Sequence, residues 1–302
     1  MQTQTQTQTQ QMQPLESVTI ATSSMLVELG ISCWTARKLD KKVSEEIDQV
    51  KNTKGKAGNY HKHLLAGNPH LEAVNRYAAK VRLWNTQQTI PWSDNGGRIV
   101  TMENLFNGGY KQQLDAHKAE FERLAESFVQ VYPTLISAAA FQLGDLFDRD
   151  EYPEPEVVSK KFKFNYTLMP LPTSGDFRID IAEQAKAELV SHYEEQFNDR
   201  LGAAMRDVWG RLHDCLTHMS DRLTVDEDGK RRVFHGTMLT NARELVGLLK
   251  RLNVTNDPKL EEARRDLEQA LVNADTETIK ESDYVRDTVK QKVDAIINKY
   301  NW

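Results

Sequence analysis

The segment KFKFNYTL, residues 161–168, decides the fold class because it is a strand pattern set between two long helical patterns. Its apolar residues Phe162, Phe164 and Tyr166 alternate with polar ones, and this period of two is typical of a half-buried strand. After a loop that contains two prolines, the alternation resumes over residues 177–181. We therefore expect two antiparallel strands between the two longest helices of the chain.

Long helices are predicted on both sides of these strands. Before them, apolar residues recur at alternating steps of four and three, a coiled-coil-like heptad pattern in which His117 is a polar interruption and Pro133 should cause a kink. The predicted stripe is Tyr110, Leu114, His117, Phe121, Leu124, Phe128, Val131, Leu135 and Ala138. After the strands, steps mostly of four predict a second long helix. Its stripe is Leu189, Tyr193, Phe197, Leu201, Met205, Val208, Leu212, Leu216, Met219 and Leu223.

Shorter elements are predicted elsewhere from similar signals. Asp40 is a good N-cap for a helix that carries Val43, Ile47 and Val50 on one apolar face. Gly and Asn residues predict a loop and a hairpin turn. The expected elements are a strand at 24–34, helices at 40–51 and 69–84, a loop at 52–59, a hairpin at 89–101, and helices at 237–252, 258–272 and 276–298.

Together these elements predict an α+β fold that is predominantly helical, with long antiparallel helices and a small two- to three-stranded antiparallel sheet. The polar, low-complexity residues 1–14 are expected to be a disordered Gln/Thr tail. We expect an N-terminal helical section at 15–152, the strand pair with the second long helix at 153–225, and a C-terminal helical section at 226–302. These sections are expected to form one continuous fold over 15–302.

Charge and composition restrict the compartment and the partners. The net charge of −5 gives no general attraction to nucleic acid or anionic lipid, so such contacts would need a local patch. The two cysteines, Cys33 and Cys215, lie far apart in sequence, which fits a reducing compartment. Because there is no apolar run of about 18 residues and no signal-peptide pattern, we expect a cytoplasmic protein without membrane contact.

Three clusters of titratable residues are candidates for a chemical site: residues 61–70, 213–218 and 145–156. The histidines of the first cluster lack an acidic partner, and the His and Cys residues of the second point to different sides of a helix. The acidic third cluster lacks the glycine and the final glutamate of a calcium loop. We therefore expect no catalytic, cofactor-binding or metal site and a protein that is not an enzyme.

Basic residues cluster around the loop at 51–62, at the strand start at 160–163 and at 230–232. Lysines interleaved with aromatic residues on a sheet can follow phosphates and stack bases. The same pattern also fits an ordinary half-buried strand with a polar outer face. The candidate nucleic-acid contacts are Lys54, Lys56, Lys161 and Lys163.

Three segments carry a resemblance to a known family: WTARKL at 34–39, IPWSD at 90–94 and GDFR at 175–178. In these segments the chain resembles a family of bacteriophages and some proteobacteria known as domain of unknown function 3150. Members of that family are often encoded near MoxR-type AAA+ ATPases. The resemblance implies an accessory role beside such an ATPase, and it carries over no functional residues.

Our leading hypothesis is a non-enzymatic accessory protein that acts through protein–protein contacts, as an adaptor for an AAA+ ATPase. Trp34, Arg37, Trp92 and Arg98 are the candidate partner contacts, because interfaces favour tryptophan and arginine, although both tryptophans also suit a core. Long helices with one apolar stripe also predict a homo-oligomer. The alternative hypothesis is a nucleic-acid-binding protein of phage replication or recombination.

Overall fold

The computed structural model describes residues 20–172, 183–225 and 230–302. Helices dominate, and the described strands form one four-stranded and one two-stranded sheet, so the prediction of a mainly helical α+β fold is confirmed. The chain divides into two compact units, each assembled from separate stretches of sequence. Of the described residues, unit 1 contains 20–28, 86–110, 167–172, 183–225 and 230–302, and unit 2 contains 29–85 and 111–166.

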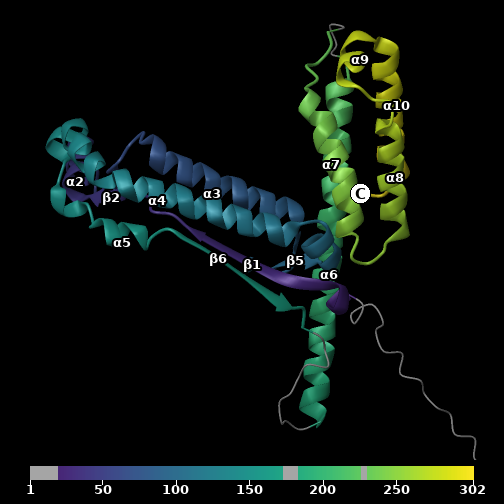
Figure 1. Cartoon of the computed structure of the whole chain (residues 1–302), viewed down its shortest axis with the longest axis horizontal. Helices are drawn as coiled ribbons and strands as arrows, with labels where there is room; N and C mark the ends of the chain where they lie inside the picture. The colour runs from purple at the N-terminus through teal and green to yellow at the C-terminus, as the bar shows by residue number, and fades with distance from the viewer. Residues whose placement is uncertain (1–19, 173–182, 226–229) are drawn as a thin grey trace, which may run out of the picture. The chain divides into compact units, whose positions relative to one another are not determined.

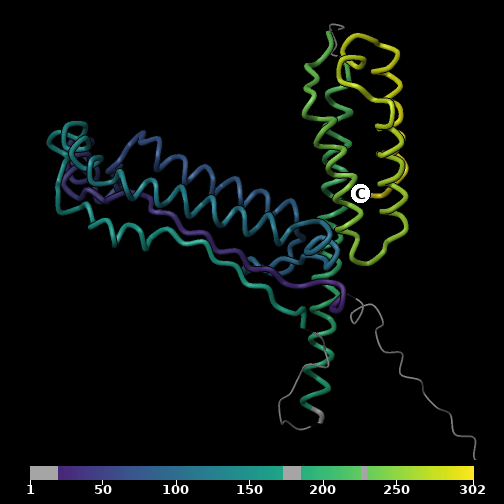
Figure 2. Tube along the Cα trace, viewed as in Figure 1, coloured from purple at the N-terminus to yellow at the C-terminus, as the bar shows by residue number. Residues whose placement is uncertain are grey.

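Unit 2 is built on two helices that lie side by side, α3 (Pro69–Gln88) and α4 (Tyr110–Leu143) (Figure 1). The chain runs along α3 and returns along α4, so the two helices are antiparallel (Figure 2). The Tyr77 hydroxyl lies 2.9 Å from His117 Nδ1, and the Trp84 ring meets the His117 ring edge-on at 4.6 Å. His117, the polar residue in the predicted stripe, therefore lies where α4 contacts α3.

The buried side of α4 follows the predicted heptad only as far as Phe128. The heptad also placed Ala138 in the stripe, but Ala138 is exposed, so this part of the prediction is wrong. The buried residues beyond Phe128 are Tyr132, Ile136 and Ala139. A straight helix has 3.6 residues per turn, so a seven-residue repeat slips by about 20° per heptad. Pro133 lies inside α4, and the helix continues past it as predicted.

The larger sheet has four strands in the order β4-β5-β1-β6. These strands are β4 (Ile90–Pro91), β5 (Arg98–Thr101), β1 (Ser24–Ser32) and β6 (Lys163–Pro170). β4 and β5 form the predicted hairpin, and β5 pairs with β1 in antiparallel register. This pairing makes the sheet larger than the two or three strands predicted. The predicted partner strand at 177–181 lies outside the described residues.

Several short elements of unit 2 lie together beyond the paired helices (Figure 1). They are β2 (Arg37–Asp40), α2 (Lys41–Val50), β3 (Tyr60–His63), α5 (Pro155–Ser159) and the 3₁₀ turns Gly144–Leu146 and Arg149–Glu151. β2 and β3 pair in antiparallel register. Strand β3 was not among the elements predicted from the sequence. The strand pattern is hard to see there because the buried residue at its centre is Lys62.

Unit 1 contains a helical bundle in which α6 (Glu183–Leu223) packs against α7 (Gly236–Leu252) and α10 (Asp283–Lys299). α8 (Pro258–Leu271) packs against α7 and α10, and α9 (Thr276–Glu281) precedes α10. The helix predicted at 276–298 is therefore broken in two. Ser282 causes the break, because its hydroxyl accepts a hydrogen bond from Val285 N and caps α10.

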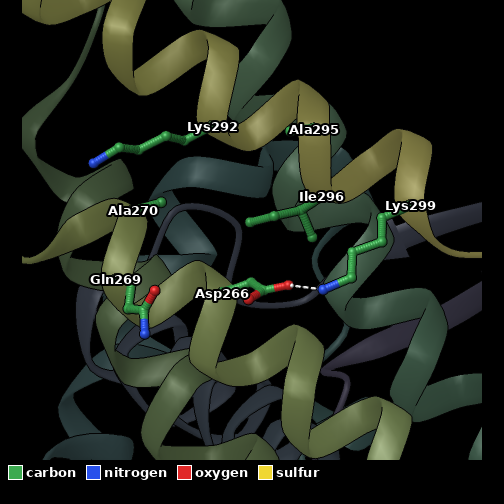
Figure 3. A pocket seen from close by; sticks show the side chains of 7 residues that line it. All are labelled: Asp266, Gln269, Ala270, Lys292, Ala295, Ile296 and Lys299. Atoms are coloured by element: carbon green, nitrogen blue, oxygen red, sulfur yellow. Dashed lines mark hydrogen bonds and ion pairs between the residues drawn. The ribbon is translucent and has the colours of Figure 1, made fainter.

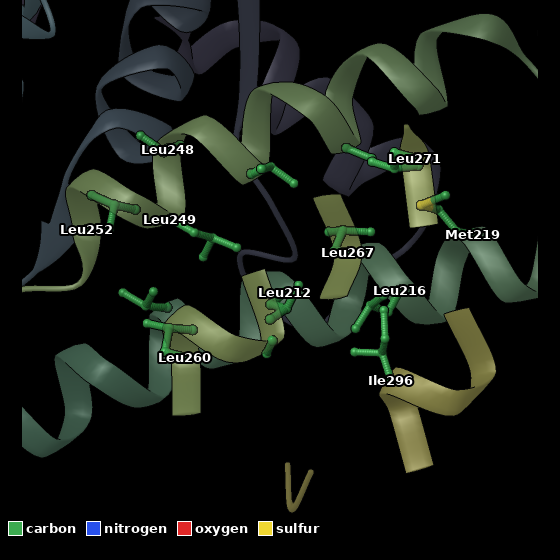
Figure 4. Packing of buried hydrophobic residues seen from close by; sticks show 14 of the residues in the cluster. Leu212, Leu216, Met219, Leu248, Leu249, Leu252, Leu260, Leu267, Leu271 and Ile296 are labelled. Atoms are coloured by element: carbon green, nitrogen blue, oxygen red, sulfur yellow. The ribbon is translucent and has the colours of Figure 1, made fainter. Parts of the chain in front are cut away.

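The core of unit 1 follows the predicted stripe of α6 from Phe197 to Leu223. Figure 4 shows leucines of α6, α7 and α8 gathered in this core together with Ile296 of α10. Leu212 and Leu216 are completely buried. Steps of four along α6 turn its apolar side gradually, so one helix can contact several neighbours along its length.

Candidate functional site

The two tryptophans among the candidate partner contacts are core residues. Trp34 is 8% exposed and meets Tyr132 edge-on at 5.4 Å, within unit 2. Trp92 is 7% exposed and meets Phe197 edge-on at 5.1 Å, within unit 1. Partners do not reach such rings without unpacking the core, so the alternative that both tryptophans serve packing agrees with their burial.

Arg98 is also engaged inside its own unit. Its guanidinium donates to Thr89 Oγ1 at 2.6 Å and to the carbonyls of Thr86 and Thr89 at 3.1 and 3.0 Å. Arg211 donates to the carbonyls of Thr86, Gln87 and Thr89 at 2.8–3.0 Å. Burial and the nearby Arg211 lower the pKa of Arg98. The two arginines supply donors and positive charge to the carbonyl end of α3, which is a structural role.

The aromatic side of β6 faces the core of unit 2. The rings of Phe162, beside the start of the strand, and Phe164 lie 5.6 and 5.7 Å from the rings of Phe128 and Phe121 on α4. Lys161 and Lys163 are exposed. Because the rings of Phe162 and Phe164 pack on α4, they are not free to stack bases beside the exposed lysines.

Lys62, one of the lysines around the predicted basic loop, is not available to phosphates. It is 5% exposed, and its Nζ lies 2.7 Å from Glu151 Oε2 and 3.4 Å from Asp40 Oδ2. Nζ also donates to the Leu146 carbonyl at 2.7 Å. Burial alone would lower the pKa of Lys62, but its bonds to Glu151 and Asp40 outweigh burial and raise it. Lys62 therefore ties β3 to the turns that follow α4.

Helix α2 lies on this scaffold with its polar side inward. Asp40 Oδ1 accepts from Val43 N at 3.1 Å and caps the helix. Ser44 is the buried residue of α2, and its hydroxyl donates to the Asp40 carbonyl and accepts from Tyr60 N of β3. Most of the predicted apolar face therefore turns toward solvent: Ile47 is 46% and Val50 is 75% exposed, whereas Val43 is half-buried.

The loop after α2 is held in place by Asp48. Its carboxylate accepts from Thr53 Oγ1 at 3.1 Å and from Ala57 N at 3.2 Å. These bonds span both sides of Lys54 and Lys56, which are exposed. The two candidate lysines thus project from a loop whose backbone is fixed to α2.

Cations without ion pairs are frequent on α2 and in the segments directly before and after it. Residues 37–63 carry eight Lys and Arg residues against four Asp and Glu residues, a formal charge of +4 in a chain whose total is −5. In the described part of the chain, seven of the eight form no ion pair within 4.0 Å. They are Arg37, Lys38, Lys41, Lys42, Lys51, Lys54 and Lys56. We call these cations together with Val43, Ile47 and Val50 the α2 surface.

The predicted cluster at 213–218 separates into two places in unit 1. Cys215 and His218 line a cavity of about 520 Å³ between α6 and α7, together with His235. His213 instead stacks on Trp302, with ring centroids 4.8 Å apart. Burial raises the pKa of the Cys215 thiol to about 11, so it stays protonated near neutral pH and is a poor nucleophile.

A smaller cavity, of about 260 Å³, lies between α8 and α10 (Figure 3). Lys299 Nζ lies 2.7 Å from Asp266 Oδ2 and 2.9 Å from Glu262 Oε1. Hydrogen bonds to these two carboxylates raise the pKa of Lys299. The charge of Lys299 is thus neutralised, and these ion pairs tie α10 to α8.

Comparison with known proteins does not indicate a function, so function has to be inferred from the surfaces of the two units. No family model, curated protein or solved structure matches the chain. Among the described residues, no three His, Cys, Asp or Glu side chains gather as ligands for a metal ion. No described helix combines the length and apolar character needed to cross a bilayer.

Proposed function

We propose that the chain is a non-enzymatic accessory protein that acts through protein–protein contacts, and that the α2 surface is its contact site. The exposed apolar face of α2 carries this proposal. Ile47 and Val50 expose aliphatic surface although the helix is amphipathic enough to bury it. An apolar patch with a charged rim is the usual make-up of a protein interface.

The partner that we propose is an AAA+ ATPase, for which the chain would act as an adaptor in the host cytoplasm. The support for this partner is the resemblance to the phage family noted above. Because the α2 surface is part of unit 2, the contact with this partner would lie on unit 2.

The test is affinity purification of the tagged chain from producing cells, with and without nuclease, followed by mass spectrometry. The double variant I47D/V50D should lose a nuclease-resistant partner, because it places carboxylates in the apolar contact. The matched control is V272D, since Val272 is an exposed aliphatic residue of unit 1. Equal recovery of partner by I47D/V50D and by the control would contradict the proposal.

Nucleic-acid binding remains a second candidate, favoured by the seven unpaired cations of the α2 surface. Lys54 and Lys56 are held on a fixed loop, and Lys161 and Lys163 are exposed as well. The same purification separates the two functions. Nucleic-acid binding requires that co-purifying material disappears with nuclease and that K54E/K56E recovers less of it at low salt.

A further inference from the structure

The backbone of α2 leaves only its side chains to a partner. Its N-terminus is capped by Asp40, and at its end Lys51 N donates to the Ile47 carbonyl at 3.0 Å. Within a helix the backbone groups bond to one another, so a partner strand cannot add to it as it does to a sheet edge. Recognition must therefore use the exposed side chains.

The apolar side chains of α2 form one ridge. Val43, Ile47 and Val50 follow the spacing i, i+4, i+7, which covers about 10 Å along the helix. A partner helix with aliphatic residues at the same spacing packs against such a ridge. The ridge therefore suits a helical segment of about two turns.

Charge sets the chemistry of that segment. Seven exposed cations without ion pairs lie on α2 and in the segments directly before and after it, whereas Glu45 and Glu46 are the exposed acidic residues of the helix. Complementary potentials favour an acidic partner and reject a basic one. We propose that the α2 surface binds an acidic amphipathic helix of a partner protein, an inference that rests on the function proposed above.

Other occupants fit the surface less well. A second copy of α2 would bring the same cations face to face, which is repulsive. Nucleic acid uses aromatic side chains to stack successive bases, and Tyr60 is the single aromatic residue of residues 37–63. Interfacial membrane helices bury a longer apolar face that usually includes Trp or Phe, which α2 lacks.

The experiment measures binding of labelled probes to the full chain by fluorescence anisotropy. The main probe is a synthetic Leu/Glu peptide with leucines at i, i+4 and i+7, and the same composition in scrambled order is its control. A Leu/Lys peptide, single-stranded DNA and phosphatidylglycerol vesicles are the competing probes. We expect the patterned Leu/Glu peptide to bind about tenfold or more tightly than the scrambled one.

Two variants locate the binding on α2. I47D/V50D should abolish peptide binding, whereas V272D should not change it. The charge reversal K51E/K54E/K56E should weaken the Leu/Glu peptide and allow the Leu/Lys peptide to bind, which simple unfolding would not produce. Retained melting temperatures in the variants show that each one is folded.

Either of two results would overturn the inference: equal binding of the scrambled peptide, or tighter binding of DNA or vesicles that I47D/V50D abolishes. These results differ from a failure of the proposed function. If I47D/V50D loses its cellular partner while no peptide binds, the contact site stands and the acidic helix is wrong. If the cellular partner is retained by I47D/V50D, the contact site itself is wrong.

Discussion

Arg211 shows how much a single polar side chain can do at the end of a helix. Its guanidinium bonds to three carbonyls at residues 86–89 and forms an ion pair with Asp207 at 2.7 Å. These carbonyls end α3 and have no further turn to bond to. Arg98 meets the same group from the neighbouring strand, so the two arginines replace the missing turn.

We predict that R211A lowers the free energy of unfolding by about 1–3 kcal/mol, because carbonyls in a half-buried place lose their donors. Urea unfolding followed by circular dichroism measures this change. R123A is the control, since Arg123 is exposed and pairs mainly with Glu120 on the same helix. A loss no larger than that of R123A would show that Arg211 does not hold the end of α3.

His117 predicts a pH dependence of stability. Burial, followed by the charge of Lys80, lowers the pKa of His117 below its usual 6.5. The unfolded chain therefore binds a proton more readily, so stability is complete above about pH 6.5 and falls as the pH drops toward the lower folded pKa. H117Q should reduce the difference in urea midpoint between about pH 7.5 and pH 5.5. H63Q, at an exposed position, should leave that difference unchanged.

Lys62 marks a residue-scale limit of sequence-based prediction. In the sequence it stands between two histidines near a loop rich in Gly and Lys, which favours an exposed cation. Its ion-pair partner Glu151 is distant in sequence, so neither burial nor the strand could be predicted from local pattern. Asp40 shows the contrary case, because an N-cap depends on adjacent residues and was predicted correctly.

At the scale of elements, the buried side of α4 can be compared with the side that the heptad pattern predicts. We predict that A139E destabilises the chain by about 2 kcal/mol or more, because it places a carboxylate in a packed core. A138E should have little effect, since Ala138 is exposed. Thermal unfolding of the two variants measures the difference. Equal destabilisation would mean that the buried side of α4 is broader than the structure indicates.

Which face of α2 points into the protein could not be predicted from its sequence. The apolar face of Val43, Ile47 and Val50 was found correctly, and a hydrophobic face normally points inward. Here Ser44 takes the inner position because its hydroxyl bonds to both β2 and β3. Candidate residues at this site were therefore found as isolated cations, Arg37, Lys54 and Lys56, without the ridge that joins them.

At the scale of the whole molecule, we predict that each unit has its own stability. L212A removes a fully buried side chain from unit 1 and should cost about 2–5 kcal/mol. Hydrogen exchange should then speed up in α7, α8 and α10 more than in α3 and α4, because compact units tend to open separately. F128A should give the opposite pattern. Uniform acceleration in both variants would show one cooperative unit instead.

The fold class and the long helices were predictable because their patterns extend over many turns. The sheet was not predicted completely, because β5 and β1 are far apart in the sequence and β5 is only four residues long. Pairing at such a distance leaves no local signal beyond alternation. The division into two units has the same cause, since its boundaries fall inside continuous elements such as β1 and α4.

The interleaving of the two units sets an order of events on the ribosome. Unit 2 is complete in sequence once residue 166 has been made, whereas unit 1 needs the remaining 167–302. At about 5–20 residues per second, that remainder takes on the order of ten seconds to emerge. The first strand and the β4–β5 hairpin must wait for this time with their apolar sides uncovered. Nascent chains of this protein should therefore need a chaperone most during the second half of translation.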